Sequence, residues 1–217
     1  MFLDAAAEAA IKQRTAALES ATGVEVVAAV IARADSYPEV PWKAFALGVS
    51  LSALAAVVAA AVDPGWEAFE AVAETAVITL ITGAAAALAT VWIPPCARLL
   101  LTRTRRQAEV LQYAQAMFLE AELHRTRRRD GILLLVSLLE HEVVVLTDRG
   151  IRERLRPGEL DPVVAAVTAR LKRGELESAL RDGIAQLEAV LAARGFRSQP
   201  GEANELSDAP IQRQGPT

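Results

Sequence analysis

Two long runs without any charged residue constrain this chain more than any other feature of its sequence. The runs cover the nineteen residues 44–62 and the twenty-three residues 75–97. Because a helix needs about 20 residues to cross a bilayer core of about 30 Å, each run fits one crossing. The runs therefore predict two transmembrane helices joined by an outer loop, residues 63–74. The alternative is a pair of buried helices, which requires an unusually large soluble core for 217 residues.

The residues that flank these runs suit a membrane interface. The loop between the runs holds Asp63, Glu67, Glu70 and Glu74 and no basic residue. Under the positive-inside rule, the basic flanks face the cytoplasm and the acidic loop faces outside. The sequence thus predicts a multi-pass membrane protein with both termini in the cytoplasm. The expected membrane anchors are tryptophans and cations near the helix ends, namely Trp42, Lys43, Trp66, Trp92, Arg98 and Arg103.

Small residues recur every four positions in both runs, a spacing that lets two helix backbones approach closely. The rows consist of Gly48, Ser52 and Ala56 in the first helix and Thr79, Gly83 and Ala87 in the second. We expect these rows to form the contact surface of the hairpin, with a seam between two copies as the alternative. Neither run contains an ionisable residue, which counts against a channel or a pump.

Outside the hairpin, helical and strand patterns alternate. Helices are expected at residues 4–19 and 104–124, from Asp161 to Gly174, and at 175–194, and strands at 24–34, 132–139 and 142–147. A strand that leads through a helix to a second strand predicts a parallel pair, and the third strand then pairs antiparallel to the second. The fold class is therefore α/β, with a small mixed sheet. The expected parts are residues 1–41 (first helix and strand), 42–102 (inserted hairpin), 103–195 (remainder of the domain) and 196–217 (disordered tail).

Several short stretches resemble a known family. Thr22-Gly23-Val24-Glu25-Val26 is similar to the opening of TPM domains. The stretches Phe118-Leu119-Glu120, Leu123-His124-Arg125-Thr126, residues 131–137, Glu140 and Asp148-Arg149-Gly150-Ile151 resemble the bacterial membrane branch of that family, which carries a transmembrane pair after its first strand. The resemblance covers about residues 10–195. It implies a TPM-like α/β/α sandwich with an inserted two-helix transmembrane hairpin.

The resemblance also bears on activity. Some relatives bind calcium and have weak acid phosphatase activity, and others are accessory or assembly factors for membrane complexes. Several soluble relatives have a Gly-rich turn and an Asp pair after the central strand. Here those positions read Leu138-Leu139-Glu140-His141, with fewer acids.

The predicted topology brings a few polar residues together. Asp130 and Asp148 fall at one end of the sheet, with Glu25 near that end. Three carboxylates with backbone carbonyls suit Ca²⁺, which takes six to eight oxygen ligands. The alternative is that both aspartates cap turns and that Glu25 pairs with Arg149.

The opposite end of the predicted sheet collects Asp35, Ser36, Glu140 and His141. We do not expect catalysis there, because no nucleophile elbow surrounds Ser36. The chain also lacks the sequence motifs of zinc, nucleotide and dinucleotide sites, so no further cofactor is predicted.

A run of arginines follows the second predicted helix of the soluble part. It consists of Arg125, Arg127, Arg128 and Arg129 and contains no aromatic residue, in a chain of net charge −4. Nucleic acid is therefore not an expected partner. Anionic lipid headgroups and a solvated linker both remain open for this run.

These observations, with the resemblance, favour a multi-pass protein of a bacterial inner membrane with a cytoplasmic TPM-like binding domain that helps to assemble or maintain a membrane complex. The expected partners are the bilayer with its anionic headgroups and a protein in the same membrane, and a homo-oligomer remains open. The alternative is a divalent-metal-dependent acid phosphatase that uses Glu25, Asp130 and Asp148 with Ca²⁺.

Overall fold

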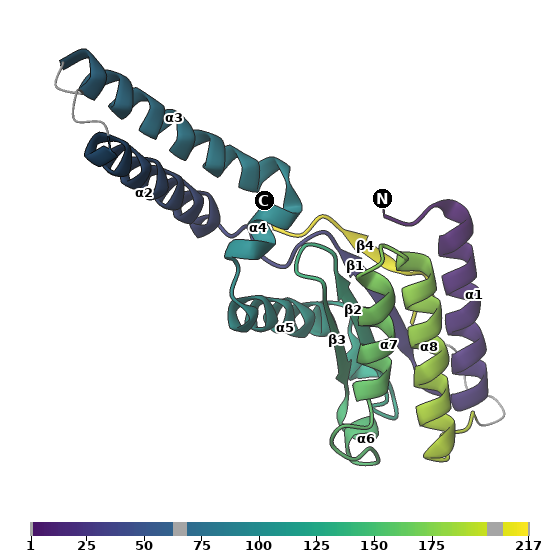
Figure 1. The fold of residues 1–217 in the computed structure, drawn as a ribbon. Coiled ribbons are helices and arrows are strands. Elements are labelled where there is room, and N and C mark those ends of the chain that lie inside the picture. Colours follow the sequence, from purple (N-terminus) through teal and green to yellow (C-terminus); the bar gives the residue numbers. More distant parts are fainter. Residues whose placement is uncertain (1, 63–68, 199–205, 217) are drawn as a thin grey trace. The chain divides into compact units, whose positions relative to one another are not determined.

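The computed structural model describes residues 2–62, 69–198 and 206–216 (Figure 1). The chain forms two compact units. We call Met1–Asp35 with Arg106–Thr217 the sheet unit, and Ser36–Arg105 the hairpin unit.

The sheet unit alternates helices and strands. Its elements are α1 (Ala5–Thr22), β1 (Val26–Ile31), most of α5 (Arg103–Glu120), η1 (Leu123–Arg125), β2 (Ile132–Ser137), β3 (Glu142–Thr147), α6 (Arg149–Arg152), α7 (Asp161–Leu171), α8 (Leu176–Ala193) and β4 (Ile211–Arg213). The four strands form one mixed sheet in the order β3-β2-β1-β4. β1 pairs parallel with β2, and β2 pairs antiparallel with β3. The predicted mixed α/β class is confirmed.

Two helical layers cover the sheet. Val26, Ala28 and Val30 of β1 point toward one face, where they pack with residues of α1, α7 and α8. Val27, Ala29 and Ile31 point toward the other face, where α5 packs on them. Every residue of β1 and β2 is buried. This alternation explains why both strands are continuous apolar runs, since each has a covered layer on both sides.

The start of the chain shows how local sequence sets these elements. Asp4 caps α1 by accepting a hydrogen bond from the N–H of Ala7 over 2.7 Å. Gly23 ends the helix with φ +67°, a left-handed conformation that glycine adopts without strain. The chain then turns directly into β1.

The C-terminal segment corrects one prediction. We expect residues 196–217 to be disordered, but Ile211–Arg213 form β4, which pairs parallel with Ala29–Ile31 of β1 and lies beside it in Figure 1. The side-chain Oε1 of Gln212 accepts hydrogen bonds from the N–H groups of Phe2 and Leu3 over 2.7 and 3.0 Å. Specific long-range bonds hold this polar segment, and its composition gives no sign of them. Residues 199–205 of the predicted tail lie outside the described ranges.

The hairpin unit contains α2 (Glu39–Val62), α3 (Phe69–Trp92) and α4 (Pro94–Leu100). The predicted second helix, residues 75–97, is corrected at its end. α3 ends at Trp92, and Pro94 and Pro95 begin the separate helix α4. Proline lacks the N–H that a continuous helix needs but fits the first turn of a new one.

Helices α2 and α3 pack through small residues. A Cβ on Gly48 would lie 3.0 Å from Ala86 Cβ and 3.1 Å from Gly83 Cα. One turn further along, Ser52 Oγ and Thr79 Oγ1 lie 3.3 Å apart, within hydrogen-bond distance. The backbones therefore approach closely along the rows that the sequence pattern identifies.

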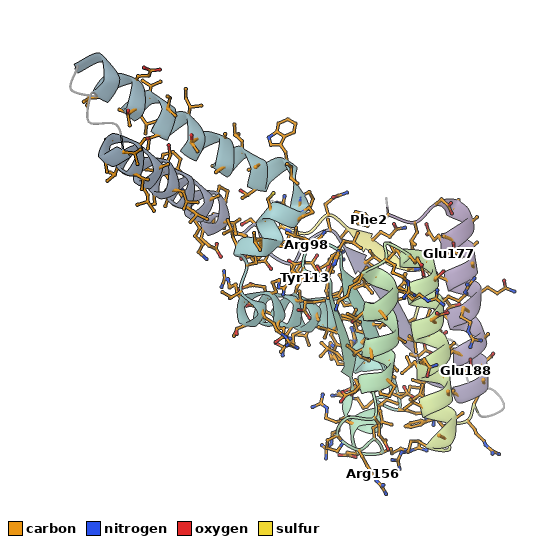
Figure 2. All side chains as sticks on the ribbon, in the orientation of Figure 1. Phe2, Arg98, Tyr113, Arg156, Glu177 and Glu188 are labelled. Atoms are coloured by element: carbon orange, nitrogen blue, oxygen red, sulfur yellow. The ribbon has the colours of Figure 1, made fainter. Side chains whose placement is uncertain are left out.

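The two helices are long and apolar enough to cross a membrane, over Glu39–Val62 and Val72–Trp92. Their large apolar side chains are exposed, for example Leu54 (60%), Val58 (55%) and Ile81 (61%). Figure 2 shows side chains projecting around both helices. A buried core helix would cover these groups, whereas a lipid-facing helix presents them to hydrocarbon.

The close approach at Gly83 generates a prediction. Because a Cβ there would lie 2.6 Å from Val49 Cγ2 and 3.0 Å from the Phe45 ring, Gly83→Val should push α2 and α3 apart. A disulfide between cysteines placed at Ser52 and Thr79, in a Cys96→Ser background, measures their separation. Gly83→Val should lower its yield severalfold.

Ala84→Val is the matched control, since Ala84 is the neighbouring residue and is exposed. It should leave the disulfide yield unchanged. Equal yields in Gly83→Val and the parent protein would show that the helices do not depend on this contact.

Candidate functional site

Asp130 and Asp148 lie at one end of the sheet. The N–H of Asp148 donates to Gly131 O over 2.9 Å, so the residues that adjoin β2 and β3 are neighbours there. The two aspartates are buried, with 5% and 6% of their surfaces exposed. Each carboxylate faces an arginine: Arg128 Nε lies 3.5 Å from Asp130 Oδ2, and Arg129 Nε lies 2.9 Å from Asp148 Oδ2. Both negative charges are thus compensated within the fold.

Asp148 also begins helix α6. Its Oδ1 accepts a hydrogen bond from the N–H of Arg149 over 2.7 Å, which is the capping role of the structural alternative. That alternative also pairs Glu25 with Arg149, and this part is wrong. The guanidinium of Arg149 bonds to Glu153 Oε1 over 2.6 Å instead, because the two residues are one helical turn apart.

Glu25 is turned toward the C-terminal segment. Its Oε2 accepts a hydrogen bond from the N–H of Leu206 over 3.2 Å. The three carboxylates predicted as calcium ligands therefore have separate partners within the fold. In residues 2–62, 69–198 and 206–216, no group of three or more His, Cys, Asp or Glu side chains is arranged to hold a metal ion.

A buried acid that the sequence analysis misses lies at the end of α1. Glu19 is 9% exposed, and its Oε1 accepts a hydrogen bond from the N–H of Val26 over 2.8 Å. Burial raises the pKa of Glu19 to about 9; the Val26 hydrogen bond opposes this shift, whereas the carboxyls of Asp208 and Glu25 add to it. Glu19 therefore carries a proton at neutral pH. The helical spacing of the sequence gives one sign of this burial. Glu19 lies four positions after Thr15 and eight after Ile11, so the three buried residues share one face of α1.

The opposite end of the sheet contains a second buried acid, Glu140. It is fully buried, its Oε1 accepts a hydrogen bond from the N–H of Ala34 over 2.9 Å, and its Oε2 bonds to the hydroxyl of Ser137. The backbone O of Glu140 accepts a hydrogen bond from Arg106 Nη1 over 3.3 Å. Glu140 thus joins the β2–β3 turn to the chain that leaves β1. The hydroxyl beside Glu140 belongs to Ser137, which the sequence analysis does not single out.

The arginine run that follows α5 is compensated by nearby acids. Arg125 bonds to Glu122 over 2.5 Å, and Arg128 and Arg129 face the two buried aspartates. These pairs reduce the net positive charge that the run presents to a polyanion.

The expected membrane anchors belong to the hairpin unit. Trp42 and Trp92 are 73% and 80% exposed. Lys43 and Arg103 are exposed and Arg98 is half-buried, while Trp66 lies outside the described ranges. Near the start of α2, Glu39 Oε1 lies 3.6 Å from Arg105 Nε. Aromatic and cationic side chains therefore lie near the ends of the apolar helices, and their role as membrane anchors stays a prediction.

Comparisons with known proteins support the family resemblance. Residues 97–190 match the family model of the TPM domain. The chain is also similar to the NMR structure of the BA42 protein from the psychrophilic bacterium Bizionia argentinensis, with a TM-score of 0.59 and 16% identity over 98% of this chain and 96% of that chain. At this identity the likeness concerns the fold alone. No curated protein matches the chain.

The raised pKa of Glu19 predicts a pH dependence of stability. Its value of about 9 in the folded protein lies above the ordinary value of 4.5, so folding takes up a proton. The stabilisation is complete below the lower value and is lost as the pH rises toward the higher one. Glu19→Gln keeps the acceptor for Val26 but cannot ionise. It should flatten the fall of the free energy of unfolding by up to about 1.4 kcal/mol per pH unit between about pH 6 and pH 8.5.

Urea titrations of the full chain in detergent at several pH values measure this slope. Glu177→Gln is the matched control, because Glu177 is an exposed glutamate on α8, labelled in Figure 2. It should behave as the parent protein does. A slope that is the same in Glu19→Gln and the parent would contradict an ionisation linked to folding.

The bonds of Glu140 predict a large structural effect. Glu140→Ala leaves the N–H of Ala34 and the hydroxyl of Ser137 buried without their partner. The free energy of unfolding should fall by about 2–4 kcal/mol, measured by urea titration in detergent. Glu122→Ala, at an exposed residue, should change it by less than about 0.5 kcal/mol. Equal effects of the two substitutions would show that Glu140 does not hold the turn.

Proposed function

On the premise that residues 97–190 carry a TPM domain, we propose that this chain is an integral membrane protein whose TPM domain serves as a binding domain at the cytoplasmic surface. Its role is accessory: it binds a protein in the same membrane and helps to assemble or maintain a membrane complex. One observation carries this proposal, namely that two adjacent apolar helices expose their large side chains and are flanked by Trp42, Trp92 and basic residues.

The insertion point of the helices supports a tethered binding domain. The hairpin enters after β1 and returns the chain to α5, so it interrupts the sheet unit instead of extending one end of it. Only residues 32–38 separate β1 from α2, and only residues 101–102 separate α4 from α5. An extended residue spans at most about 3.6 Å, so two short connections keep the domain beside the bilayer. A domain held there is within reach of proteins in the same membrane.

The charges support the orientation. Lys43 lies near the first residue of the hairpin unit and Arg98, Arg103 and Arg105 lie near its last, so these cations flank both connections to the sheet unit. Residues 63–74 carry only acidic charges. Under the positive-inside rule, this charge pattern favours a sheet unit in the cytoplasm of a bacterial cell and a loop outside its inner membrane.

Labelling of single cysteines in a Cys96→Ser background tests this topology. Trp66→Cys should react with a membrane-impermeant maleimide in intact spheroplasts, whereas Arg173→Cys, at an exposed residue of the sheet unit, should react only after permeabilisation. The opposite pattern would overturn the orientation. Recovery of the full chain in the soluble fraction after cell lysis would overturn the membrane assignment.

The accessory role has its own test. In native membranes solubilised with a mild detergent, the tagged full chain should migrate in a complex that contains a second membrane protein. Glu140→Ala, which weakens the TPM domain but leaves the hairpin intact, should reduce this complex while the chain stays in the membrane. Migration of the chain without any other protein would contradict the binding role.

A further inference from the structure

Arginines gather at the end of the sheet where β2 begins and β3 ends. Three segments meet there, residues 122–130, 148–159 and 194–198, and we call them the arginine end. Together they hold ten arginines, five acidic residues and no lysine, in a chain of net charge −4. Because the arginines outnumber the acids by five, the ion pairs within this end leave a positive surface.

Direct contacts join the three segments. The N–H of Gly150 donates to Arg129 O over 2.9 Å, and a Cβ on Gly150 would lie only 2.7 Å from that oxygen. Arg154 Nη2 donates to Arg194 O over 3.2 Å, and the Arg154 guanidinium lies 3.6 Å from the centre of the Phe196 ring. In Figure 1, α6 and the end of α8 lie at the same end of the sheet unit. The arginine end is therefore one surface built from three parts of the chain.

Two of its arginines are fixed by acids that lie beneath them. Buried Asp130 and Asp148 face Arg128 and Arg129, whose side chains remain 37% and 54% exposed. A guanidinium has five N–H donors, so one that faces a carboxylate on one side still has donors for a second acceptor. Because the fold already restricts these side chains, a bound anion costs them less conformational entropy.

Other acids near this end of the sheet do not neutralise the surface. Glu19 and Glu25 are buried, and Glu19 carries a proton at neutral pH. Asp208 hydrogen-bonds to Glu19, and Glu25 binds the N–H of Leu206. These acids interact with one another and with the backbone on the side of α1.

The topology counts against lipid headgroups as the occupant. Val26, the first residue of β1, pairs with Ile132, so the arginine end lies at the start of β1. The chain leaves for the hairpin unit beyond Ile31, at the other end of β1, and a strand of six residues spans about 20 Å. The return connection reaches the arginine end only through α5, whose eighteen residues span about 27 Å.

The side chains count against single-stranded nucleic acid, which stacks its bases on exposed aromatic rings. Phe196 is the one Phe, Tyr or Trp residue of the arginine end, and it is buried under Arg154. Carboxylates, in contrast, are the partners that these arginines already use. Arg149 Nε bonds to Glu153 Oε1 over 2.6 Å, and Arg194 Nε bonds to Glu159 Oε2 over 2.8 Å.

We propose that the arginine end binds an acidic segment of another protein, a run of Asp and Glu side chains. This inference rests on the binding role proposed above and names the chemistry of the partner. The excess of five arginines suits a segment with about five carboxylates, each paired with a guanidinium as Glu153 and Glu159 are. Arginine is also enriched in protein–protein interfaces, where its planar group forms paired hydrogen bonds with carboxylates.

Reversal of charge tests the surface in the full chain. The probe is a short, fluorescently labelled peptide of alternating glutamate and serine, and its anisotropy is measured against the protein in phosphatidylcholine nanodiscs. Arg156, labelled in Figure 2, and Arg197 are both exposed at the arginine end. The double variant Arg156→Glu/Arg197→Glu should raise the dissociation constant of the peptide by about tenfold or more.

Arg173→Glu/Arg181→Glu is the matched control, because it changes the net charge equally at two exposed residues outside the arginine end. It should keep the dissociation constant within about twofold of the parent value. Urea titrations should show that both double variants unfold at the parent midpoint. Equal weakening by the two double variants would overturn the proposal, since net charge and not this surface would then govern binding.

Two further outcomes would assign the surface to another occupant and overturn the proposal. One is a single-stranded RNA of equal charge that binds more tightly than the peptide and loses affinity in Arg156→Glu/Arg197→Glu. The other is loss of peptide binding in nanodiscs rich in phosphatidylglycerol, which would show that lipid headgroups occupy the arginines.

The complex isolated from native membranes separates this inference from the accessory role. Arg156→Glu/Arg197→Glu should remove the second membrane protein from the complex, and Arg173→Glu/Arg181→Glu should retain it. A complex that survives the first double variant would overturn the inference and leave the accessory role standing. A parent chain that migrates without any other protein would contradict the accessory role, and the peptide titration would still decide whether the arginine end binds an acidic segment.

Discussion

The parallel pairing of β1 with β2 is the interaction on which the rest of this structure depends. Val26 pairs with Ile132, so the ladder joins segments that are separated by the whole hairpin unit. Closing a flexible loop of that length costs conformational entropy. The hairpin reduces this cost because it folds into two packed helices that return the chain to its starting point. The approach of Arg105 to Glu39, 3.6 Å apart, shows that the entry and the exit of the insertion are neighbours.

Several acidic side chains of the sheet unit fix neighbouring segments by accepting hydrogen bonds from their backbone N–H groups. Glu140 joins the β2–β3 turn to the chain beyond β1, and Glu25 holds the backbone of Leu206. Glu19 binds the first N–H of β1. In each case a side-chain carboxyl oxygen accepts a hydrogen bond from a backbone N–H of another segment. Buried acids of this kind therefore do not by themselves indicate a metal site.

Sequence reasoning succeeded where hydrophobic patterns extend over many residues. The strands β2 and β3, the α5 crossover and the two apolar helices follow from such patterns, because each pattern is long enough to match one kind of element. β4 could not be predicted in the same way. Its three residues contain one apolar side chain, and the long-range contacts of Gln212 with the N-terminus hold the segment in place. The same limit applies to the candidate site, since the pairing of Arg149 with Glu153 and of Glu25 with Leu206 depends on tertiary geometry. Residue type alone left those pairings open.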